Sequence, residues 1–210
     1  MIFVSENAHE NLISYLKSLD EITIIHGTDL VYSEVSSHPD IYMCDLKDKV
    51  IHAENDELGF KYPENCAFNA ACTGKYFIHN LKITSKRLLK EAEGMQHIDV
   101  PQGYTKCNVL TIDEESIITS DRGIYEKCKD SLNTLLITES TKETPHVLLK
   151  GFPYGFIGGA TGRVKDEIIF NGKISDHPDY EKIKEFIESR GLKIKEFDHP
   201  LEDIGSIIHE

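Results

Sequence analysis

The chain has 210 residues, of which 40% are hydrophobic and 28% charged, and its formal net charge is −13. This length can bury one sizeable core, so we expect a single domain spanning residues 1–210. The acidic balance argues against a nucleic-acid-binding protein, because phosphate contacts need clustered Lys and Arg. It is compatible with a small cationic ligand.

The cysteines and the first residues indicate a reducing compartment. The chain has 5 cysteines and no CxxC pair, and an odd number cannot all pair within one chain. The opening MIFVSENAHE has neither a basic start nor a long apolar core. No apolar run approaches the ~20 residues of a membrane span. We therefore expect reduced thiols in a cytoplasmic protein without membrane contact.

The opening segment predicts a strand, a helix and a second strand. Residues 2–4 and 22–25 are apolar and strand-prone. Asn7 and Glu10 have the spacing of a capping box at the start of the helix. The helix should place four apolar side chains on one face: Ala8, Leu12, Leu16 and Leu19. This segment resembles a β-β-α-β unit that lacks its first strand.

The second segment has a weaker pattern. Residues 30–35 are strand-prone, and residues 41–46 and 50–53 predict a hairpin. Gly59 and Pro63 interrupt the periodicity that follows. We therefore expect a unit whose helix is shortened or replaced by a loop.

Three further segments each predict a hairpin, a helix and a closing strand. The expected hairpins pair residues 67–72 with 76–79, 109–112 with 117–119, and 161–164 with 167–170. The expected closing strands are residues 97–100, 135–138 and 192–197, and residues 147–149 could add a strand. Thr84 or Ser85 should cap the first of these helices, and Ser120 or Asp121 the second. Gly94 should end the first helix in a left-handed conformation.

The last residues supply the strand that the opening segment lacks. The chain ends in DIGSIIHE, and residues 205–208 resemble the first strand of a unit. Pairing the two ends would complete five units and cover an edge strand. Repeats of about 35–45 residues are typical of propellers and solenoids. The predicted class is α/β (α+β), a ring of five β-β-α-β units closed by the terminal strands. An ordinary α+β domain with accidental repeats is the alternative.

This layout resembles the pentein fold of guanidino-group-modifying enzymes: arginine deiminases, dimethylarginine hydrolases and amidinotransferases. Six stretches are similar to signature segments of a small, functionally uncharacterised bacterial family of that fold: HPDIYM, NCAFNAACTGKYFI, QGYTKCNVL, ITSDRGI, FIGGATGRV and DIGSI. The resemblance covers nearly the whole chain. It implies a hydrolase or transferase acting on guanidino or related C–N compounds, without a cofactor. The alternative is a non-catalytic pentein that binds a small molecule or a protein, like the ribosome anti-association factor.

The resemblance also implies a site at the axis of the ring. Pentein enzymes gather there a Cys nucleophile, a His that exchanges protons, and carboxylates that bind the guanidinium. Their Cys follows an acidic, Gly-containing segment in the last unit. The comparable segment here is Asp203-Ile204-Gly205-Ser206, so Ser206 stands where the thiol is expected. Because a hydroxyl is a poorer nucleophile without a positioned base, this is a departure from the enzyme pattern.

Three residues are candidates for catalysis. Cys107 is the leading thiol, because it begins a predicted first strand next to Asn108. His38 and Asp40 precede another first strand and could transfer protons and bind a guanidinium. The ordinary roles are a small buried hydrophobe for Cys107 and a turn for His38. The tripeptide His177-Pro178-Asp179 repeats the latter motif at a helix start, where capping explains it.

Polar residues at the starts of apolar strands are candidates for ligand binding: Asn65, Asn69, Asn108, Asp203 and Ser206. In a ring they would face a central cavity or bond to a neighbouring unit, because unpaired burial is costly. Cys44, Cys66 and Cys72 are weaker candidates for the thiol, and Cys128 belongs to the core. No histidine spacing predicts a metal site. The expected partner is a small guanidino-type cation.

The glycine-rich run at residues 158–163 is not expected to bind phosphate. It lacks the Lys-Ser/Thr ending of a phosphate loop, and a strand follows it in place of a helix. Close approach of backbones at the axis is the simpler explanation of these glycines.

Overall fold

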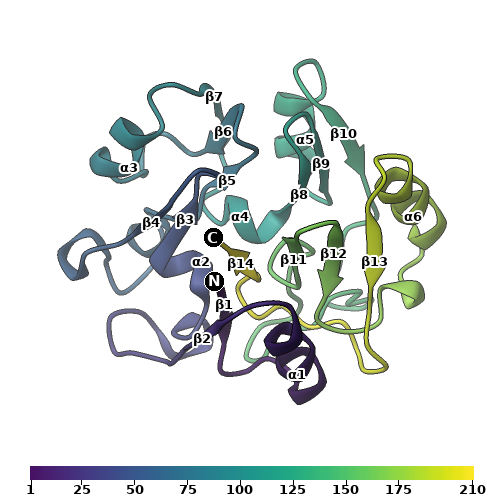
Figure 1. Cartoon of the computed structure of the whole chain (residues 1–210). Coiled ribbons are helices and arrows are strands. Elements are labelled where there is room, and N and C mark those ends of the chain that lie inside the picture. Colours follow the sequence, from purple (N-terminus) through teal and green to yellow (C-terminus); the bar gives the residue numbers. More distant parts are fainter.

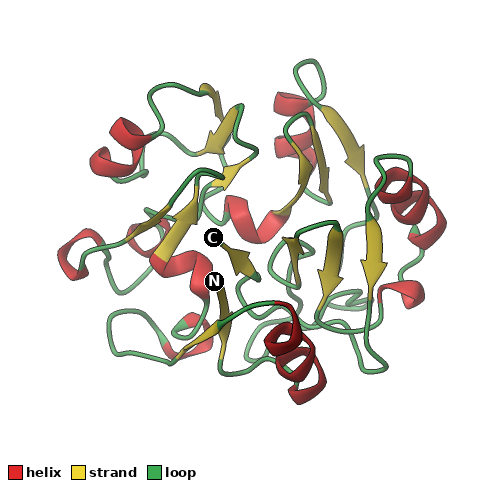
Figure 2. Ribbon diagram, in the orientation of Figure 1, coloured by secondary structure: helices red, strands yellow, loops and turns green.

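A computed structural model describes residues 1–210 as a mixed α and β fold with five small sheets. The sheets surround a common centre, the longer helices lie outside them, and both chain ends lie near the middle (Figures 1 and 2). The strands, sheet by sheet, are β14 (Ile208–His209), β1 (Ile2–Ser5) and β2 (Ile22–Ile25); β3 (Met43–Asp45) and β4 (Val50–His52); β5 (Ala71–Cys72), β6 (Tyr76–His79) and β7 (Gln96–Asp99); β8 (Val109–Asp113), β9 (Ser116–Thr119) and β10 (Asn133–Leu136); β11 (Thr161–Val164), β12 (Glu167–Phe170) and β13 (Lys193–Lys195).

The three internal three-stranded sheets share one topology. Each begins with an antiparallel hairpin, and a helix then leads to a third strand parallel to the second. The three helices are α3 (Lys86–Glu91), α5 (Arg122–Cys128) and α6 (Tyr180–Glu188). The predicted β-β-α-β order is therefore confirmed in these units.

The two chain ends pair in one sheet, as predicted. β14 runs antiparallel to β1, with Ile2 opposite His209 and Phe3 opposite Ile208. β1 is parallel to β2 across α1 (Glu10–Leu19). The last strand of the chain thus supplies the first strand of this sheet, and it covers one edge of β1.

The first strands of the units lie next to one another around the centre. β14 lies beside β11, β11 beside β8, β8 beside β5, and β5 beside β3. Ile208 of β14 packs in one cluster with Met43 of β3. The segments that precede these five strands therefore meet in the middle of the molecule.

The hydrophobic core lies at the seams between neighbouring units. One cluster joins β8 and β9 to β12 and α6, a second joins β1 and α1 to β11 and β12, and a third joins β5 and β6 to β8, β9 and α5. The amphipathic helices supply the outer half of each seam, as Leu12 and Leu16 do in α1. The apolar clusters thus lie between the units, and the candidate polar residues lie nearer the centre.

The second unit has two strands and no long helix, as the broken periodicity predicted. Its sheet is the β3–β4 hairpin, and a 3-10 helix follows at Asn55–Glu57. The other 3-10 helices of the chain are Ser33–Val35, Glu64–Cys66 and Ile174–Asp176. No helix is long and apolar enough to cross a bilayer.

Two single-turn helices replace predicted strand starts. Pro39–Tyr42 form α2, where the proline occupies the first turn, so only Met43–Asp45 of the predicted strand 41–46 is extended. Thr105–Asn108 form α4, so Cys107 lies on a helical turn before β8 and the prediction that it begins the strand is wrong.

Four smaller predictions are also wrong. Residues 30–35 contain a 3-10 helix instead of a strand. Residues 147–149 make only an isolated bridge, between Leu148 and Glu202. His9 caps α1 and accepts from the backbone N–H of Asn11, so no Asn7–Glu10 capping box forms. Gly94 is not left-handed, because α3 already ends at Glu91. By contrast, Ser85 and Asp121 cap α3 and α5 as expected.

The glycine-rich run allows backbones to touch at the centre, as predicted. A Cβ at Gly158 would lie 2.3 Å from the carbonyl oxygen of Lys106, and one at Gly162 would lie 2.1 Å from that of Ile207. The backbone of Gly159 donates to Cys107 O at 2.9 Å and accepts from Ser206 N at 2.7 Å. This run therefore holds the segment before β8 against the segment before β14.

Candidate functional site

The side chains of the candidate site come from the segments that precede first strands of different units. His38 and Asp40 precede β3, Cys107 precedes β8, and Asp203 and Ser206 precede β14. The N–H of Asp40 donates to Gly205 O at 3.1 Å, which ties two of these segments together. These five residues, which are far apart in the sequence, are thus brought together by the packing of the sheets and by no local motif.

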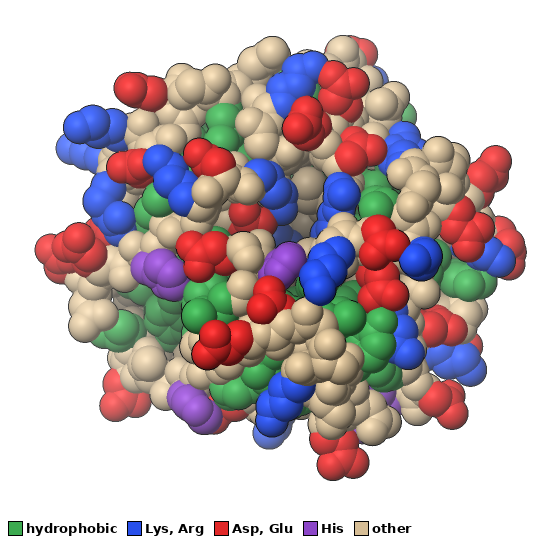
Figure 3. All heavy atoms as spheres, viewed as in Figure 1, with side chains coloured by type: hydrophobic (Ala, Val, Ile, Leu, Met, Phe, Trp, Pro, Cys, Tyr) green, Lys and Arg blue, Asp and Glu red, His purple; other side chains and the backbone are tan.

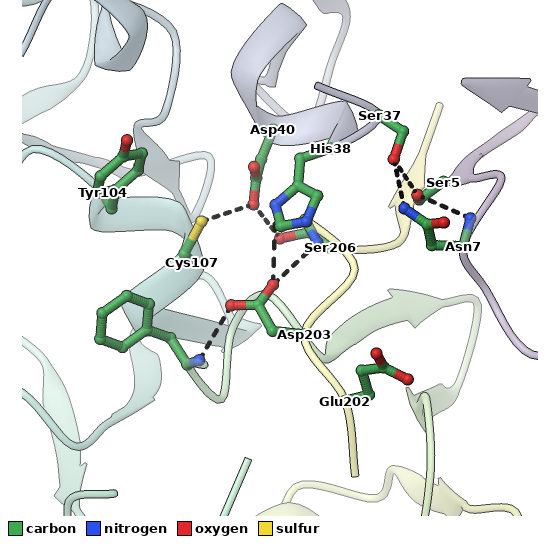
Figure 4. Close-up of polar contacts among 12 residues, drawn as sticks. Ser5, Asn7, Ser37, His38, Asp40, Tyr104, Cys107, Glu202, Asp203 and Ser206 are labelled. Atoms are coloured by element: carbon green, nitrogen blue, oxygen red, sulfur yellow. Dashed lines mark hydrogen bonds and ion pairs between the residues drawn. The ribbon is translucent and has the colours of Figure 1, made fainter. Parts of the chain in front are cut away.

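A thiol, a carboxylate and a hydroxyl form a buried chain (Figure 4). The Cys107 thiol donates to Asp40 Oδ2 at 3.1 Å, and the Ser206 hydroxyl donates to the same oxygen at 2.8 Å. All three side chains are buried, with Asp40 and Ser206 at 0% exposure. Asp40 is therefore the carboxylate on which both candidate nucleophiles converge.

Asn69 fixes the helical turn that carries the thiol. Its Oδ1 accepts from the N–H groups of Lys106 at 2.9 Å and Cys107 at 3.3 Å. Its Nδ2 donates to Cys107 Sγ at 3.3 Å and to Asp40 O at 3.2 Å. One amide side chain thus satisfies the start of α4 and links it to α2.

Asp203 is a second buried carboxylate. Its Oδ1 accepts from Gly205 N at 2.9 Å, and its Oδ2 accepts from Phe156 N at 3.0 Å. His38 Nδ1 lies 4.0 Å from Oδ1 (Figure 4). Burial, and secondarily the charge of Asp40, raise the pKa of Asp203 to about 6, although His38 opposes the shift. This carboxylate is therefore destabilised in its charged form.

Consecutive left-handed residues shape the segment before β14. Gly205 has φ +74° and Ser206 has φ +73°. A Cβ at Gly205 would lie 2.1 Å from His38 Cβ, so only glycine allows this close approach. The left-handed conformation costs Ser206 about 1 kcal/mol. Such strain is typical of functional sites, and here it directs a hydroxyl at Asp40.

Two polar atoms of the site are buried without a hydrogen-bond partner: His38 Nδ1 and Asp40 Oδ1. Leaving such a group unpaired costs about 1–3 kcal/mol, and nearly all buried polar groups are paired in folded proteins. One is a ring nitrogen and the other a carboxylate oxygen. The protein itself supplies neither atom with a hydrogen-bond partner.

A cavity of about 250 Å³ lies at this site and is lined by His38 but not by Asp40. His38, Cys107 and Asp203 are part of its lining, and we call these three residues its floor and the other eight, of which five are aromatic, its walls. The lining residues are Tyr32, Val35, His38, Tyr104, Cys107, Leu149, Phe152, Pro153, Tyr154, Phe156 and Asp203. An apolar cavity with a few convergent polar groups is the usual form of a small-molecule site.

The structure brings six of the candidate residues together and places two elsewhere. Cys107, His38 and Asp40 meet, with Asn69, Asp203 and Ser206 around them. Asn65 Nδ2 donates to the hydroxyl of Tyr104 at 2.9 Å, and Asn108 Nδ2 donates to its carbonyl at 2.8 Å. These two asparagines line no part of the cavity and hold the Tyr104 segment in place.

Lys106 belongs to the same network, and the sequence did not point to it. Its ammonium donates to Ser206 Oγ at 3.1 Å, the same hydroxyl that donates to Asp40. Burial lowers the pKa of Lys106, although Asp40 opposes the shift. The buried centre thus holds two carboxylates and one ammonium, which leaves it short of positive charge. The only sequence signal was the position of Lys106 beside Cys107.

The thiol is held in its neutral form by this environment. Burial raises the pKa of Cys107 well above the usual range, and the charges of Asp40 and Asp203 raise it further. A cation placed in the cavity would act in the opposite direction on both the thiol and Asp203. The ionisation of Cys107 is therefore coupled to whatever occupies the cavity.

A second depression surrounds the chain ends but lacks these features. It has a volume of about 370 Å³ and includes His209 and Glu210 in its lining. Figure 3 shows acidic and basic side chains interspersed around a hollow near the middle of this face. Its basic residues are already bonded, as Lys47 is to Asp45 and Arg163 is to Ile112 O. No group of three His, Cys, Asp or Glu residues suits a metal ion anywhere in the chain.

The raised pKa of Asp203 predicts a specific dependence of stability on pH. A carboxyl group has a pKa near 3.9 when unfolded, so the folded protein binds more protons between about pH 4 and 6. The free energy of unfolding should therefore fall as pH rises through this window, by at most about 3 kcal/mol from this group. Urea denaturation of the protein and of Asp203→Asn at several pH values gives the difference.

The matched control for this measurement is Asp198→Asn, because the Asp198 side chain is fully exposed. Its difference from the unmodified protein should not depend on pH. A difference between the unmodified protein and Asp203→Asn that stays constant from pH 4 to 7 would contradict the assignment.

Comparison with known proteins gives one family and a distant structural likeness. A family model described as "Family of unknown function (DUF6873)" matches residues 49–208. Among curated proteins, none matches the sequence. A crystal structure of a dimethylarginine dimethylaminohydrolase adduct with 4-chloro-2-hydroxymethylpyridine is 13% identical, with a TM-score of 0.49, and the match covers 94% of this chain and 91% of that one.

Proposed function

We propose, for a chain that belongs to the family of unknown function DUF6873, that the central cavity binds a guanidino-type cation and that Cys107 attacks its carbon. The protein would then be a hydrolase or transferase acting on guanidino or related C–N compounds. The convergence of the Cys107 thiol, the His38 imidazole and the Asp203 carboxylate at one cavity, with the buried Asp40 hydrogen-bonded to the thiol, carries this proposal.

The charges of the site suit a planar cation. Asp203 lines the cavity, and Asp40 Oδ1 is buried without a partner. Guanidinium and amidinium groups present N–H donors in the plane that carboxylate oxygens accept best. The ring faces of Tyr104 and Phe156 can stack on such a cation.

The chemistry follows from the positions of these groups. The Cys107 sulfur forms a bond to the central carbon, and the Cys107 proton passes to Asp40. The bond between carbon and the leaving nitrogen then breaks, and that nitrogen takes a proton from protonated His38 and departs as an amine. Water, deprotonated by His38, attacks the sulfur-bound carbon. The C–S bond then breaks, the departing thiolate recovers its proton from Asp40, the oxygen-bound proton of the product passes to solvent, and a urea is released. In a transferase, an amine takes the place of water.

The substrate would activate its own nucleophile. Without a ligand, burial and the carboxylates keep the Cys107 thiol protonated, because they raise its pKa. A cation next to the sulfur stabilises the thiolate and offsets the charges of Asp40 and Asp203. Thiolate formation is thus tied to the presence of the molecule that it attacks.

The arrangement of the chain supports a pentein assignment. Four of the five sheets have the β-β-α-β order when the ends are counted as one unit, and the five first strands lie next to one another at the centre. The five-unit ring that we propose places each segment before a first strand at the axis. A cytoplasmic location remains our expectation from the thiols.

A non-catalytic binding protein is the second candidate, and one observation favours it. The pKa of Cys107 is raised, whereas reactive cysteines usually have a lowered pKa. In this candidate the same cavity binds a cation, and Cys107 and Ser206 only donate hydrogen bonds to Asp40. The two candidates differ in whether a bound cation makes the thiol reactive.

A pair of alkylating agents separates the candidates. 2-Chloroacetamidine is a cation and 2-chloroacetamide is its neutral counterpart of nearly equal size. We expect the cationic agent to modify Cys107 at least about tenfold faster relative to its rate with a small thiol, because Asp40 and Asp203 attract it and it favours the thiolate. Mass spectrometry of proteolytic peptides identifies the modified cysteine.

Two controls make the result specific. In Cys107→Ser the rapid modification should vanish, and Cys72, which is buried outside the cavity, should react slowly with both agents. Equal relative rates for the cationic and neutral agents at Cys107 would reject the catalytic proposal in favour of the binding protein. Failure of any cation to bind would reject both.

A further inference from the structure

Apart from the three floor residues, the residues that line the cavity are aromatic or aliphatic. Five of the eleven lining residues are aromatic: Tyr32, Tyr104, Phe152, Tyr154 and Phe156. Val35, Leu149 and Pro153 fill the remaining wall. The part of a ligand that lies above the cation therefore meets rings and aliphatic carbon.

No cationic side chain lines the cavity, and its only charged carboxylate is Asp203. The ammonium of Lys106 is bonded to Ser206 Oγ, and Lys106 does not line the cavity. A carboxylate on the ligand would lose its water without gaining a positive partner. It would also approach the negative charge of Asp203.

Apolar surface continues from the cavity to the outside. Phe152 lines the cavity and is 40% exposed, while Phe60 and Tyr62 are each 52% exposed. The Tyr62 ring lies 5.7 Å from that of Tyr104, and the Phe152 ring lies 6.0 Å from that of Tyr32. The exposed rings thus extend the wall beyond the cavity entrance.

From these walls we infer that the cavity selects guanidines or amidines whose substituent is apolar and uncharged, and that it rejects those with a carboxylate. Free arginine is therefore not the substrate. This inference rests on the proposed function, because it assumes that the cation sits at the floor. An apolar substituent gains contact with the aromatic walls, whereas a carboxylate in the same place is desolvated without a partner.

Two guanidines of equal chain length test the inference. Butylguanidine ends in a methyl group where 4-guanidinobutyrate has a carboxylate. Isothermal titration calorimetry at pH 7.5 should show butylguanidine binding at least about tenfold more tightly, with arginine as weak as 4-guanidinobutyrate. Equal or tighter binding of 4-guanidinobutyrate would overturn the selectivity and leave the proposed function standing. Failure of all three to bind would overturn both.

A change of one wall residue should reverse the preference. Phe152→Lys places an ammonium at the entrance, so 4-guanidinobutyrate should gain affinity, butylguanidine should lose it, and their ratio should fall at least about tenfold. Leu148→Lys is the matched control, because Leu148 is 41% exposed but does not line the cavity. Its ratio should stay that of the unmodified protein. An unchanged ratio in Phe152→Lys would overturn the assignment of the wall as the selective element.

Discussion

Replacing Cys107 by alanine should abolish turnover of a bound guanidine and leave its binding intact. The sulfur supplies the new bond to carbon, so its removal should lower the rate by more than about 10³-fold, as is usual for nucleophiles. Asp203 remains in the cavity lining to hold the cation, so the ligand should still raise the melting temperature. Amine release by chromatography and thermal shift with butylguanidine measure the two quantities.

Cys72→Ala is the control for this experiment. Cys72 is also a buried free thiol, but it lies on β5 away from the cavity lining. It should keep its rate. If Cys107→Ala released amine as fast as the unmodified protein, Cys107 could not be the nucleophile. Ser206 would then be the next candidate nucleophile, because its hydroxyl also donates to Asp40 and accepts from Lys106.

Gly205→Ala should destabilise the fold by about 3 kcal/mol and displace His38. Alanine pays about 1 kcal/mol or more for the left-handed backbone at φ +74°. Its Cβ would also fall 2.1 Å from His38 Cβ, and relieving such overlap costs about 1–3 kcal/mol. Urea denaturation gives the loss of stability, and calorimetry with butylguanidine should show weaker binding because His38 moves.

Gly191→Ala separates the two contributions. Gly191 follows α6 with φ +72°, nearly the same backbone conformation, but a Cβ there meets nothing within 4 Å. It should cost about 1 kcal/mol from the backbone alone and leave ligand binding unchanged. Equal destabilisation by both variants would mean that the contact with His38 has no energetic weight.

Much of the fold could be predicted from sequence because most of its β-β-α-β units are continuous in the sequence. Hairpins such as β8–β9 follow from β-branched runs on both sides of a polar corner, and α6 follows from the spacing of Ile183 and Ile187. The pairing of β1 with β14 could be predicted because one unit lacked a strand that the chain end supplied. The hairpins and the helix are encoded by residues close in the sequence, and the terminal pairing is encoded by the missing strand of one unit.

The short helices beside the site could not be predicted in this way. α2 and α4 have four residues each, too few for helical periodicity. Distant residues hold them: Asn69 Oδ1 accepts from the start of α4, and Gly205 O accepts from Asp40 N in α2. Their conformation is a consequence of the tertiary fold.

The kinds of side chain in the candidate site could be predicted from the sequence, but only some of its individual residues could. Polar residues at the starts of apolar strands indicated Asn69, Asp203 and Ser206, because buried polar groups need a partner or a ligand. Cys107 was indicated as a thiol at a predicted strand start, and Asp40 by its place with His38 before another strand. Asn65 and Asn108 gave the same signal but bond to Tyr104. The aromatic wall was missed because the path of residues 149–156 is set by contacts that no local pattern encodes.

The location of the hydrophobic clusters has a consequence for cooperativity. Because each cluster is shared by adjacent units, a unit that opens exposes apolar surface on both of its neighbours as well. The three floor residues come from the segments that precede β3, β8 and β14. If any one of these segments separates from the others, the cavity is lost. A small molecule bound there should therefore stabilise the whole fold against unfolding, and hydrogen exchange should slow even in strands that it does not contact.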